Sequence, residues 1–206
     1  INSEQSRLLG PATADWTPLH EMGWMTAAAI AAEDSQFWSH TGISIEGIQV
    51  ALDSLSQGEP RPPGGSSITQ QLAKNIFLNN ERNLERKLSE VIYALALEKQ
   101  LGKNGIIALY LNAVEFGPEL YGIKAAADAY FLKSPQNLSL TEAAYIASLL
   151  PAPNKGYEQA QEGKINRHRV NLILENMRDG DHITNEELEK AKSENLHVIP
   201  PAPSSK

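Results

Sequence analysis

Apolar side chains in this chain recur every three to four residues in one stretch after another, and this spacing constrains the fold more than any other feature. The pattern is strongest in Leu84–Gly102, which ends at a plausible glycine stop and whose predicted apolar face carries Leu84, Leu88, Val91 and Leu95. No segment shows the convincing alternation of apolar and polar residues that is typical of a half-buried strand. The sequence therefore predicts a mainly α protein.

Proline, glycine and capping residues mark where the predicted helices begin and end. Ser139 and Glu142 form a capping box that opens one helix, and Pro151 and Pro153 end it. The expected helices are Met25–Trp38, Ile43–Ser56, a segment capped by Ser67, Leu84–Gly102, Asn104–Phe116, Gly122–Leu132, Leu140–Leu150, Ile165–Gly180 and Thr184–Asn195. The segment Gln57–Gly65 holds three prolines and three glycines, which predicts a mobile loop.

Length and composition limit the class of protein. The 206 residues are 41% apolar, enough for one substantial core or for two lobes around a cleft. The balance of 18 basic against 25 acidic residues gives a formal charge of −7, which argues against a nucleic-acid binder. The absence of cysteine excludes a disulfide framework and a thiolate metal site. No run of 18 apolar residues is present, and because the chain starts at Ile1 we expect that an upstream segment, with any membrane anchor, has been removed.

The stretch GGSSITQQLAKN, Gly64–Asn75, predicts a helix start with a polar exposed face. Ser67 is the expected N-cap, and Gln70 lies at the N3 position of a capping box. The apolar stripe is Ile68, Leu72 and Ile76, and the polar residues off that stripe are Gln71, Lys74 and Asn75. Free N–H groups at a helix N-terminus, together with Lys74, can bind an anion. The alternative is an ordinary capped helix with a solvated polar face.

Two adjacent carboxylates, Glu33 and Asp34, occur in the stretch EDSQFWSHTG. They end an alanine-rich helix, so we expect them to lie against apolar surface rather than on a solvated ridge. Desolvation raises the pKa of a carboxyl group, which is how a general base or acid is made near neutral pH. The alternative is that both carboxylates only solvate a helix end, with His40 capping a turn.

Arg86 and Glu90, in the stretch RKLSE, lie four residues apart. A surface ion pair is the simplest explanation of that spacing. In the functional alternative, Glu90 and a cation face a cleft and present a carboxylate beside an anion-binding group. The three motifs support one another, because two separated glutamates, a cationic patch and a mobile loop suit sugar transfer from a phosphate leaving group.

Five motifs occur in order along the chain: EDSQFWSHTG, GGSSITQQLAKN, RKLSE, KNGIIALYLN and AAADAYF. The strings YLN, FG and YG follow one another at Tyr110–Asn112, Phe116–Gly117 and Tyr121–Gly122. From about Trp24 to Thr184 the chain resembles the peptidoglycan glycosyltransferases of family 51. These proteins occur as monofunctional transglycosylases and as the N-terminal domain of class A penicillin-binding proteins.

The resemblance implies a lysozyme-like, mainly helical fold with two lobes, in which a small jaw subdomain dips into the membrane. The jaw would correspond to about residues 43–63 of a single glycosyltransferase domain spanning residues 1–206, with a tail at about 196–206. The implied enzyme is an inverting hexosyltransferase that joins lipid II, a disaccharide-pentapeptide on a polyprenyl pyrophosphate, to a growing glycan strand. It would act at the outer, periplasmic face of the cytoplasmic membrane, with lipid II, nascent glycan, the membrane and other cell-wall synthesis proteins as partners.

Carried over residue by residue, the resemblance makes Glu33 the general base that takes the proton from the acceptor's 4-hydroxyl. Glu90 would assist the donor site or the leaving pyrophosphate, with Mg²⁺ or Mn²⁺ as the candidate cofactor. The basic residues that would neutralise the pyrophosphate are Lys74, Arg86 and Lys87. The remaining substrate-binding residues would be Asp34, His40, Ser67, Thr69, Gln70, Gln71 and Asn75.

Four positions depart from the family's motifs: Ser44 stands for Asp, Val50 for Arg, Ala108 for Glu and Asp128 for Arg. Ser67 in place of Thr is a milder change. Because Glu33 and Glu90 are both retained, we expect an active enzyme. One alternative is a weakened or inactive homologue that binds lipid II, glycan or a partner protein. The other is a lytic hydrolase, which ranks last because cleavage of a neutral sugar link does not need the cationic cluster.

Overall fold

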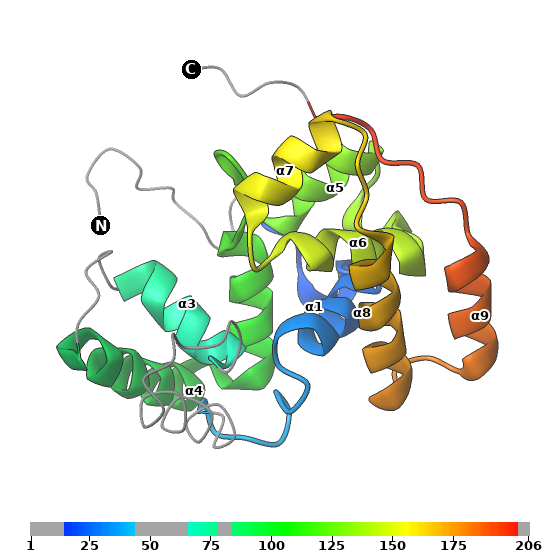
Figure 1. The fold of residues 1–206 in the computed structure, drawn as a ribbon. Coiled ribbons are helices and arrows are strands. Elements are labelled where there is room, and N and C mark those ends of the chain that lie inside the picture. The colour runs from blue at the N-terminus through cyan, green and yellow to red at the C-terminus, as the bar shows by residue number, and fades with distance from the viewer. Residues whose placement is uncertain (1–14, 44–65, 78–83, 202–206) are drawn as a thin grey trace, which may run out of the picture. The chain divides into compact units, whose positions relative to one another are not determined.

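The computed structural model describes residues 15–43, 66–77 and 84–201, with the side chains of the last range described from Ser89 onward. These residues are mainly helical, which confirms the predicted fold class (Figure 1). The chain divides into two compact units, as a two-lobed protein requires. The described part of the first unit lies between residues 36 and 110, and that of the second comprises 15–35 and 111–201. Apart from Ile43, the predicted helix Ile43–Ser56, the jaw and the loop Gln57–Gly65 lie outside the described residues.

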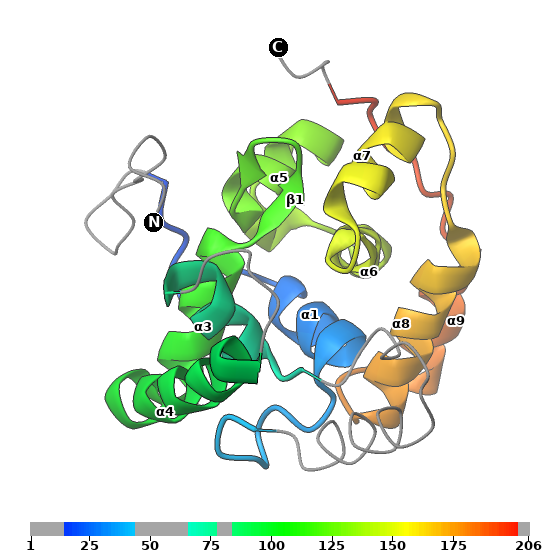
Figure 2. The same cartoon turned by 60° about the vertical axis from the view of Figure 1, so that its left-hand side comes forward.

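The first unit is built on α3 (Ile68–Phe77) and α4 (Leu84–Ala113), and α4 belongs to this unit up to Tyr110. The two helices lie side by side in both views (Figures 1 and 2). Near the C-terminal end of α3, the Phe77 ring stacks on Tyr93 of α4 with ring centroids 4.7 Å apart. Because aromatic side chains supply large contact areas, this pair helps to hold the two helices together.

The start of α3 follows the sequence prediction. The Gln70 N–H donates to Ser67 Oγ (3.1 Å) and the Ser67 N–H donates to Gln70 Oε1 (3.1 Å), which is the reciprocal pairing of a capping box. Ile68 and Leu72 are fully buried and Ile76 is half-buried, so the predicted apolar stripe faces the protein most closely in the first two turns. The polar positions off the stripe are less buried: Gln71 is intermediate, and Lys74 and Asn75 are exposed.

Helix α4 contains a break at Gly102, which has the non-helical angles φ 62° and ψ 174°. The two helices predicted on either side therefore join there as one kinked element. The predicted apolar face is wrong at Leu95, whose exposure is 45%. From Ser89 to the break, the buried positions are Glu90, Ala94 and Leu97, a stripe that the apolar pattern missed because it uses a small residue and a carboxylate.

The predicted helix Asn104–Phe116 is also wrong at its end, because α4 stops at Ala113. The chain then forms a short hairpin in which β1 (Glu115–Gly117) pairs antiparallel with β2 (Leu120–Tyr121). A Gly-Pro pair in the turn favours this change of structure. Strands of two and three residues are too short to show a period-two pattern in the sequence.

The second unit packs its helices around α6 (Leu140–Leu149), whose side chains are buried almost all round. It lies against α1 (Met25–Glu33) and α8 (Arg167–Asp179), and α1 also contacts α8 (Figures 1 and 2). The remaining elements are η1 (Leu19–Glu21), α5 (Ile123–Phe131), η2 (Pro135–Asn137), α7 (Pro153–Gln161) and α9 (Asn185–Ser193). The predicted capping box of Ser139 and Glu142 opens α6.

Two boundaries in this unit differ from the prediction. The helix expected at Met25–Trp38 ends at Glu33, because Asp34 adopts φ −161° and ψ 73° and residues 35–39 form turns. The alanine run sustains the helix, whereas Asp34 and the serine after it favour turns. Helix α7 was missed, because Pro153 was expected only to end the preceding helix and instead begins a new one.

The C-terminal tail packs on the second unit as far as it is described. The Ile199 N–H donates to the carbonyl of Tyr130 at 3.0 Å, and Pro201 is buried. Within residues 15–43, 66–77 and 84–201, no helix combines the length and apolar character needed to cross a bilayer.

The end of α4 is tied to a distant segment by Asn112. This buried side chain accepts from the Thr17 N–H (2.8 Å) and donates to the Thr17 carbonyl (2.9 Å). Gly122 packs against the Asn112 backbone: a Cβ added to it would lie 2.7 Å from the Asn112 carbonyl oxygen, and its φ of 84° suits glycine alone. The YLN and YG strings thus have a structural role in this unit.

We therefore expect Gly122→Ala to lower the free energy of unfolding by about 1–3 kcal/mol from backbone strain alone, before any steric overlap is counted. Urea unfolding followed by circular dichroism measures this effect. Gly163→Ala is a matched control for the overlap, because Gly163 also has a positive φ (68°) but has nothing within 4 Å of its added Cβ. Equal losses for the two variants would show that the close approach to Asn112 contributes nothing.

The core of the second unit contains a tyrosine pair whose ionisation opposes folding. Tyr130 and Tyr145 are buried, with ring centroids 5.9 Å apart. Burial raises the pKa of Tyr145 from 10.0 to about 12. Burial, with smaller contributions from the neighbouring phenols of Tyr145 and Tyr157, raises the pKa of Tyr130 further.

Because these pKa values are raised in the folded state, their contribution to stability is complete below about pH 10 and is lost as the pH rises towards 12. Urea unfolding between about pH 8 and 11 should show a stability that falls only above about pH 10. Tyr145→Phe removes one of the two phenols and should reduce that fall. An alkaline loss as steep as that of the parent chain would contradict the assignment to Tyr145.

Candidate active site

The first turn of α3 carries four of the predicted substrate-binding residues. Ser67, Thr69 and Gln70 are buried and Gln71 is half-buried. Besides the capping box, the Thr69 hydroxyl donates to Glu98 Oε1 of α4 at 2.8 Å. Protein contacts therefore fix these side chains before any ligand arrives, which is the preorganisation that a binding site needs.

Gln71 is oriented by Tyr110, a residue that the sequence analysis did not assign to the site. The buried Tyr110 hydroxyl donates to Gln71 Oε1 at 3.0 Å, and Gln71 Nε2 lies 3.4 Å from the Ser66 carbonyl. Tyr110 belongs to the YLN string, so the sequence contained a signal for it. Its contact with Gln71, 39 positions away, depends on the packing of α3 against α4.

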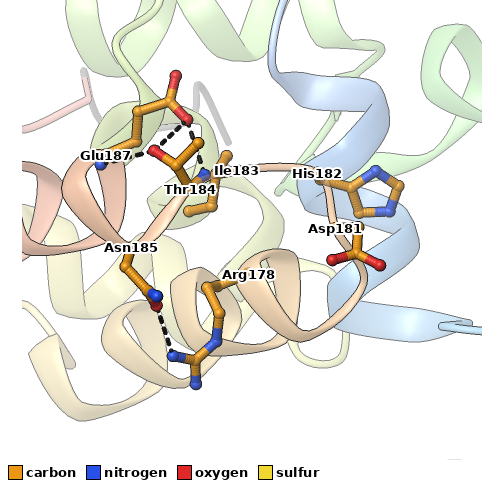
Figure 3. A pocket seen from close by; sticks show the side chains of 7 residues that line it. All are labelled: Arg178, Asp181, His182, Ile183, Thr184, Asn185 and Glu187. Carbon is orange, nitrogen blue, oxygen red and sulfur yellow. Dashed lines mark hydrogen bonds between the residues drawn. The ribbon is translucent and has the colours of Figure 1, made fainter.

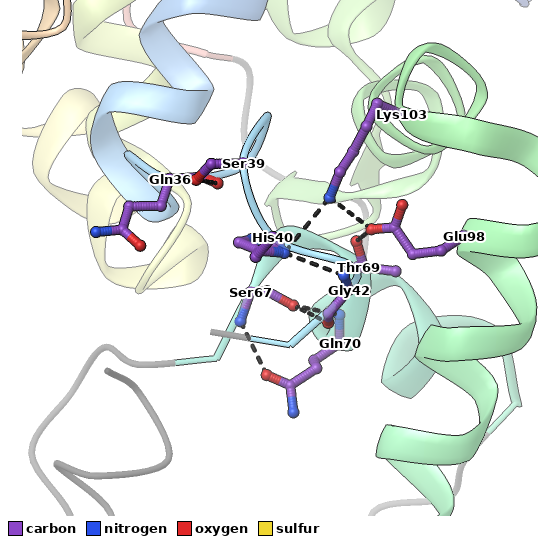
Figure 4. Close-up of polar contacts among 9 residues, drawn as sticks. All are labelled: Gln36, Ser39, His40, Gly42, Ser67, Thr69, Gln70, Glu98 and Lys103. Atoms are coloured by element: carbon purple, nitrogen blue, oxygen red, sulfur yellow. Dashed lines mark hydrogen bonds and ion pairs between the residues drawn. The ribbon is translucent and has the colours of Figure 1, made fainter. Parts of the chain in front are cut away.

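The turn before residue 43 is fastened to the start of α3 (Figure 4). The Gly42 N–H donates to His40 Nδ1 at 3.0 Å, and the Ser67 hydroxyl donates to the Gly42 carbonyl at 2.7 Å. His40 therefore closes a turn, as one interpretation of the sequence had it. Direct contact between His40 and a substrate stays a prediction.

Lys103 and Glu98 complete this cluster, and sequence reasoning missed both. Lys103 Nζ lies 2.7 Å from Glu98 Oε1 and 3.4 Å from His40 Nδ1 (Figure 4). Residues five apart point in different directions on an unbroken α-helix, so their spacing gave no reason to pair them. The break at Gly102 lies between them and changes that geometry. Lys103 is the first residue of the KNGIIALYLN motif, and this position in a motif could have marked it as a site residue.

The predicted cationic residues are described to different extents. Lys74 lies in the last turn of α3 and is exposed, as is Asn75. The backbone of Arg86 and Lys87 is helical, in the first turns of α4, and their side chains lie outside the described set. Glu90, one turn further on, is only 3% exposed. The convergence of the three cations on one pyrophosphate site thus stays a prediction.

Glu33 and Asp34 belong to the second unit, whereas the other predicted site residues belong to the first. Glu33 is the last residue of α1 and is half-buried, and Asp34 is its C-cap and is 8% exposed. The Asp34 N–H donates to the Ile30 carbonyl at 2.9 Å, which closes the helix end. The sequence correctly placed both carboxylates at the end of an alanine-rich helix. The cleft expected between Glu33 and Glu90 stays a prediction.

A metal ion at Glu90 would need ligands from beyond the side chains that the structure describes. Within the described ranges, no group of three or more His, Asp or Glu side chains comes together in a way that could hold a metal. Mg²⁺ commonly binds through one or two carboxylates and takes its other ligands from water and substrate phosphates. A single buried carboxylate such as Glu90 fits that mode of binding.

A pocket of about 410 Å³ lies in the second unit, at the turn between α8 and α9 (Figure 3). Its lining residues are Arg178, Asp181, His182, Ile183, Thr184, Asn185 and Glu187. Several of its polar groups bond to one another: Arg178 donates to Asn185 Oδ1, and Thr184 and Glu187 form the capping box of α9. None of these residues belongs to a motif that predicts the site.

Comparison with known proteins shows in which family these motifs occur. The family model described as transglycosylase matches residues 4–178. A biosynthetic peptidoglycan transglycosylase from Acinetobacter baylyi is 42% identical over 151 residues, which cover 73% of this chain and 67% of that protein. Penicillin-binding protein 1A from Aquifex aeolicus is 42% identical over 172 residues, which cover 83% of this chain and 23% of that protein.

The chain thus spans about two thirds of the first relative and less than a quarter of the second. The crystal structure of penicillin-binding protein 1A from Haemophilus influenzae aligns with a TM-score of 0.41 and 28% identity, over 65% of this chain and 17% of that chain. A TM-score below 0.5 establishes no shared fold, so the kinship rests on the sequence matches.

Proposed function

The chain belongs to the transglycosylase family, and from that membership we propose that it is a peptidoglycan glycosyltransferase that polymerises lipid II and releases polyprenyl pyrophosphate. The observation that carries the proposal is the match over residues 4–178, which includes both glutamates and the basic residues of the motifs. The buried and fixed residues at the start of α3 support it, because a donor site must hold its sugar and pyrophosphate in one geometry.

In the proposed reaction, Glu33 accepts the proton of the acceptor's 4-hydroxyl as that oxygen attacks the anomeric carbon of the donor. The bond to the pyrophosphate oxygen breaks on the opposite side, so the anomeric configuration inverts. A pyrophosphate leaving group is already a stable anion and needs charge neutralisation more than protonation. Lys74, Arg86 and Lys87 supply that positive charge, and Mg²⁺ or Mn²⁺ at Glu90 would add to it.

The finer parts of the proposal concern location and partners. The reaction places the protein at the outer face of the cytoplasmic membrane, where lipid II presents its sugars. The jaw at residues 43–63 and a membrane anchor upstream would hold it there, and other cell-wall synthesis proteins are expected partners. Apart from Ile43, the jaw lies outside the described residues.

A lipid II-binding module without activity is the second candidate function, and the replaced motif residues favour it. Ala108 is buried in α4 where the motif carries a glutamate, and Asp128 is exposed on α5 where it carries an arginine. Asp128 reverses the charge at that position. The retained Glu33 and Glu90 favour the enzyme.

Incubation with labelled lipid II in detergent, followed by gel analysis, tests the proposal directly. A ladder of glycan polymers is expected, with release of polyprenyl pyrophosphate. Binding of lipid II without polymer would favour the binding module. Shortening of preformed glycan strands, without polymer from lipid II, would favour the hydrolase.

A further inference from the structure

A largely buried ion pair in the first unit contacts the turn and helix start that carry the motif residues. Glu98 Oε1 accepts from both Lys103 Nζ (2.7 Å) and the Thr69 hydroxyl (2.8 Å). The side chains of Lys103 and Glu98 are only 18% and 13% exposed. A buried Lys–Glu pair contributes less stability than its Coulomb energy suggests, because both charges lose hydration. Its placement therefore calls for a role besides stability.

Lys103 also contacts the turn that contains Phe37 and His40. Its ammonium group lies 3.4 Å from His40 Nδ1 and 4.5 Å from the centroid of the Phe37 ring. Because Nδ1 accepts the Gly42 N–H, the neutral His40 ring carries its proton on Nε2. One cation thus contacts the ring of Phe37 by a cation–π interaction and lies beside His40 Nδ1, the same atom that accepts the Gly42 N–H.

Gly42 shows how closely the Phe37–Gly42 turn packs against α4. Its φ is 90°, and a Cβ added to it would lie 2.8 Å from Glu98 Cγ. The Ser67 hydroxyl donates to the Gly42 carbonyl from the opposite side at 2.7 Å. The Phe37–Gly42 turn, the start of α3 and α4 are therefore joined through Glu98 and Lys103 (Figure 4).

We propose that Lys103 and Glu98 are positioning residues that lock the Phe37–Gly42 turn onto the start of α3, and so set the place of Ser67, Thr69 and the glutamines that follow. The inference rests on the proposed function, since it assigns these two residues to the donor side of that reaction. Neither residue needs to touch the substrate. A displacement of about 1 Å at reacting groups can lower a rate about 100-fold, so a residue outside the site can control it.

Lys103→Met tests the proposal, because methionine keeps the length of the side chain and removes its charge. We expect the rate of polymer formation per folded molecule to fall about 10-fold to 100-fold. Lys99→Met is the matched control, since Lys99 is an exposed lysine one turn earlier on the same helix. Lys103→Arg keeps the cation and should restore a large part of the rate.

A second variant separates positioning from a loss of stability. Lys103→Met leaves the Glu98 carboxylate buried without its cation, which costs stability by itself. Glu98→Gln, added to Lys103→Met, removes that charge and can still accept from Thr69. The double variant should regain much of the unfolding midpoint and stay slow, because no cation reaches His40. Recovery of the rate together with the stability would overturn the proposal.

A measurement without substrate keeps this inference apart from the proposed function. In the ¹⁵N NMR spectrum, His40 of the parent chain should show the Nε2–H tautomer, and the Gly42 amide should exchange slowly. In Lys103→Met the Gly42 amide should exchange at least about tenfold faster. If the parent makes polymer and Lys103→Met matches its rate, the positioning role fails and the proposed function stands. If the parent makes no polymer, the proposed function fails. If the Gly42 amide also exchanges as slowly in Lys103→Met as in the parent, the positioning role of Lys103 fails as well.

Discussion

Glu33→Gln should lower the rate of polymer formation from lipid II by about 10²–10⁴-fold, the usual contribution of general-base catalysis. Glutamine keeps the shape of the side chain and its hydrogen bonding, but it cannot take a proton from the attacking hydroxyl. Glu33 is half-buried at the end of α1, and a neutral amide of the same size fits that position, so the fold should persist. The rate is measured with labelled lipid II in detergent, and circular dichroism checks the fold.

Glu158→Gln is a matched control, because Glu158 is an exposed carboxylate on α7 of the same unit. It should polymerise lipid II as fast as the parent chain. Lipid II binding by Glu33→Gln should be close to that of the parent, since the lost step is proton transfer. A Glu33→Gln variant that polymerises at the parent rate would show that the base is another residue.

Lys74→Ala should weaken the binding of an anionic phosphoglycolipid inhibitor by about 1.5–3 kcal/mol, the range for a hydrogen bond to a charged group. This corresponds to a loss of affinity of about 10-fold to 150-fold. Lys74 is exposed and lies off the buried stripe of α3, one turn after the fixed residues Gln70 and Gln71. Its ammonium group can therefore meet a ligand that the start of α3 holds.

Calorimetry with Lys99→Ala provides the control for Lys74→Ala. Both lysines are exposed on helices of the first unit, and only Lys74 belongs to the predicted donor site. Equal affinities for Lys74→Ala and the parent chain, with the fold intact, would remove Lys74 from the site. Equal losses for the two lysine variants would mean that the inhibitor responds only to the overall charge of the chain.

The parts of the fold that the sequence determined are those decided within one or two helical turns. The capping box of Ser67 and Gln70 and that of Ser139 and Glu142 each involve residues three positions apart, and both are present. The break at Gly102 is equally local, because it depends on what one residue's backbone can adopt. The sequence also placed Glu33 at a helix end and Lys74 on the exposed side of α3, since helical spacing alone fixes which positions share a face.

Other features depended on contacts between segments that are distant in the sequence. The buried stripe of α4 runs through Glu90, Ala94 and Leu97 and leaves Leu95 exposed, because the neighbouring elements decide which face is covered. The hairpin after α4 forms where β1 packs against α7, a contact that the predicted helix could not take into account. At α4 tertiary packing overrides the local apolar pattern, and at the hairpin it acts together with the turn preference of Gly117 and Pro118.

The candidate site shows the same division between features that are decided locally and contacts between segments that are distant in the sequence. Motif residues such as Ser67, Thr69 and Gln71 could be named from the sequence, but the contacts that hold them could not. These contacts are made by Glu98, Lys103 and Tyr110. Lys103 meets His40 across 63 positions, and Tyr110 meets Gln71 across 39. A hydrogen bond between such residues exists only because the folded chain brings two helices and a turn together. Propensity and spacing act along the chain, whereas these contacts act across it, so only the tertiary structure decided them.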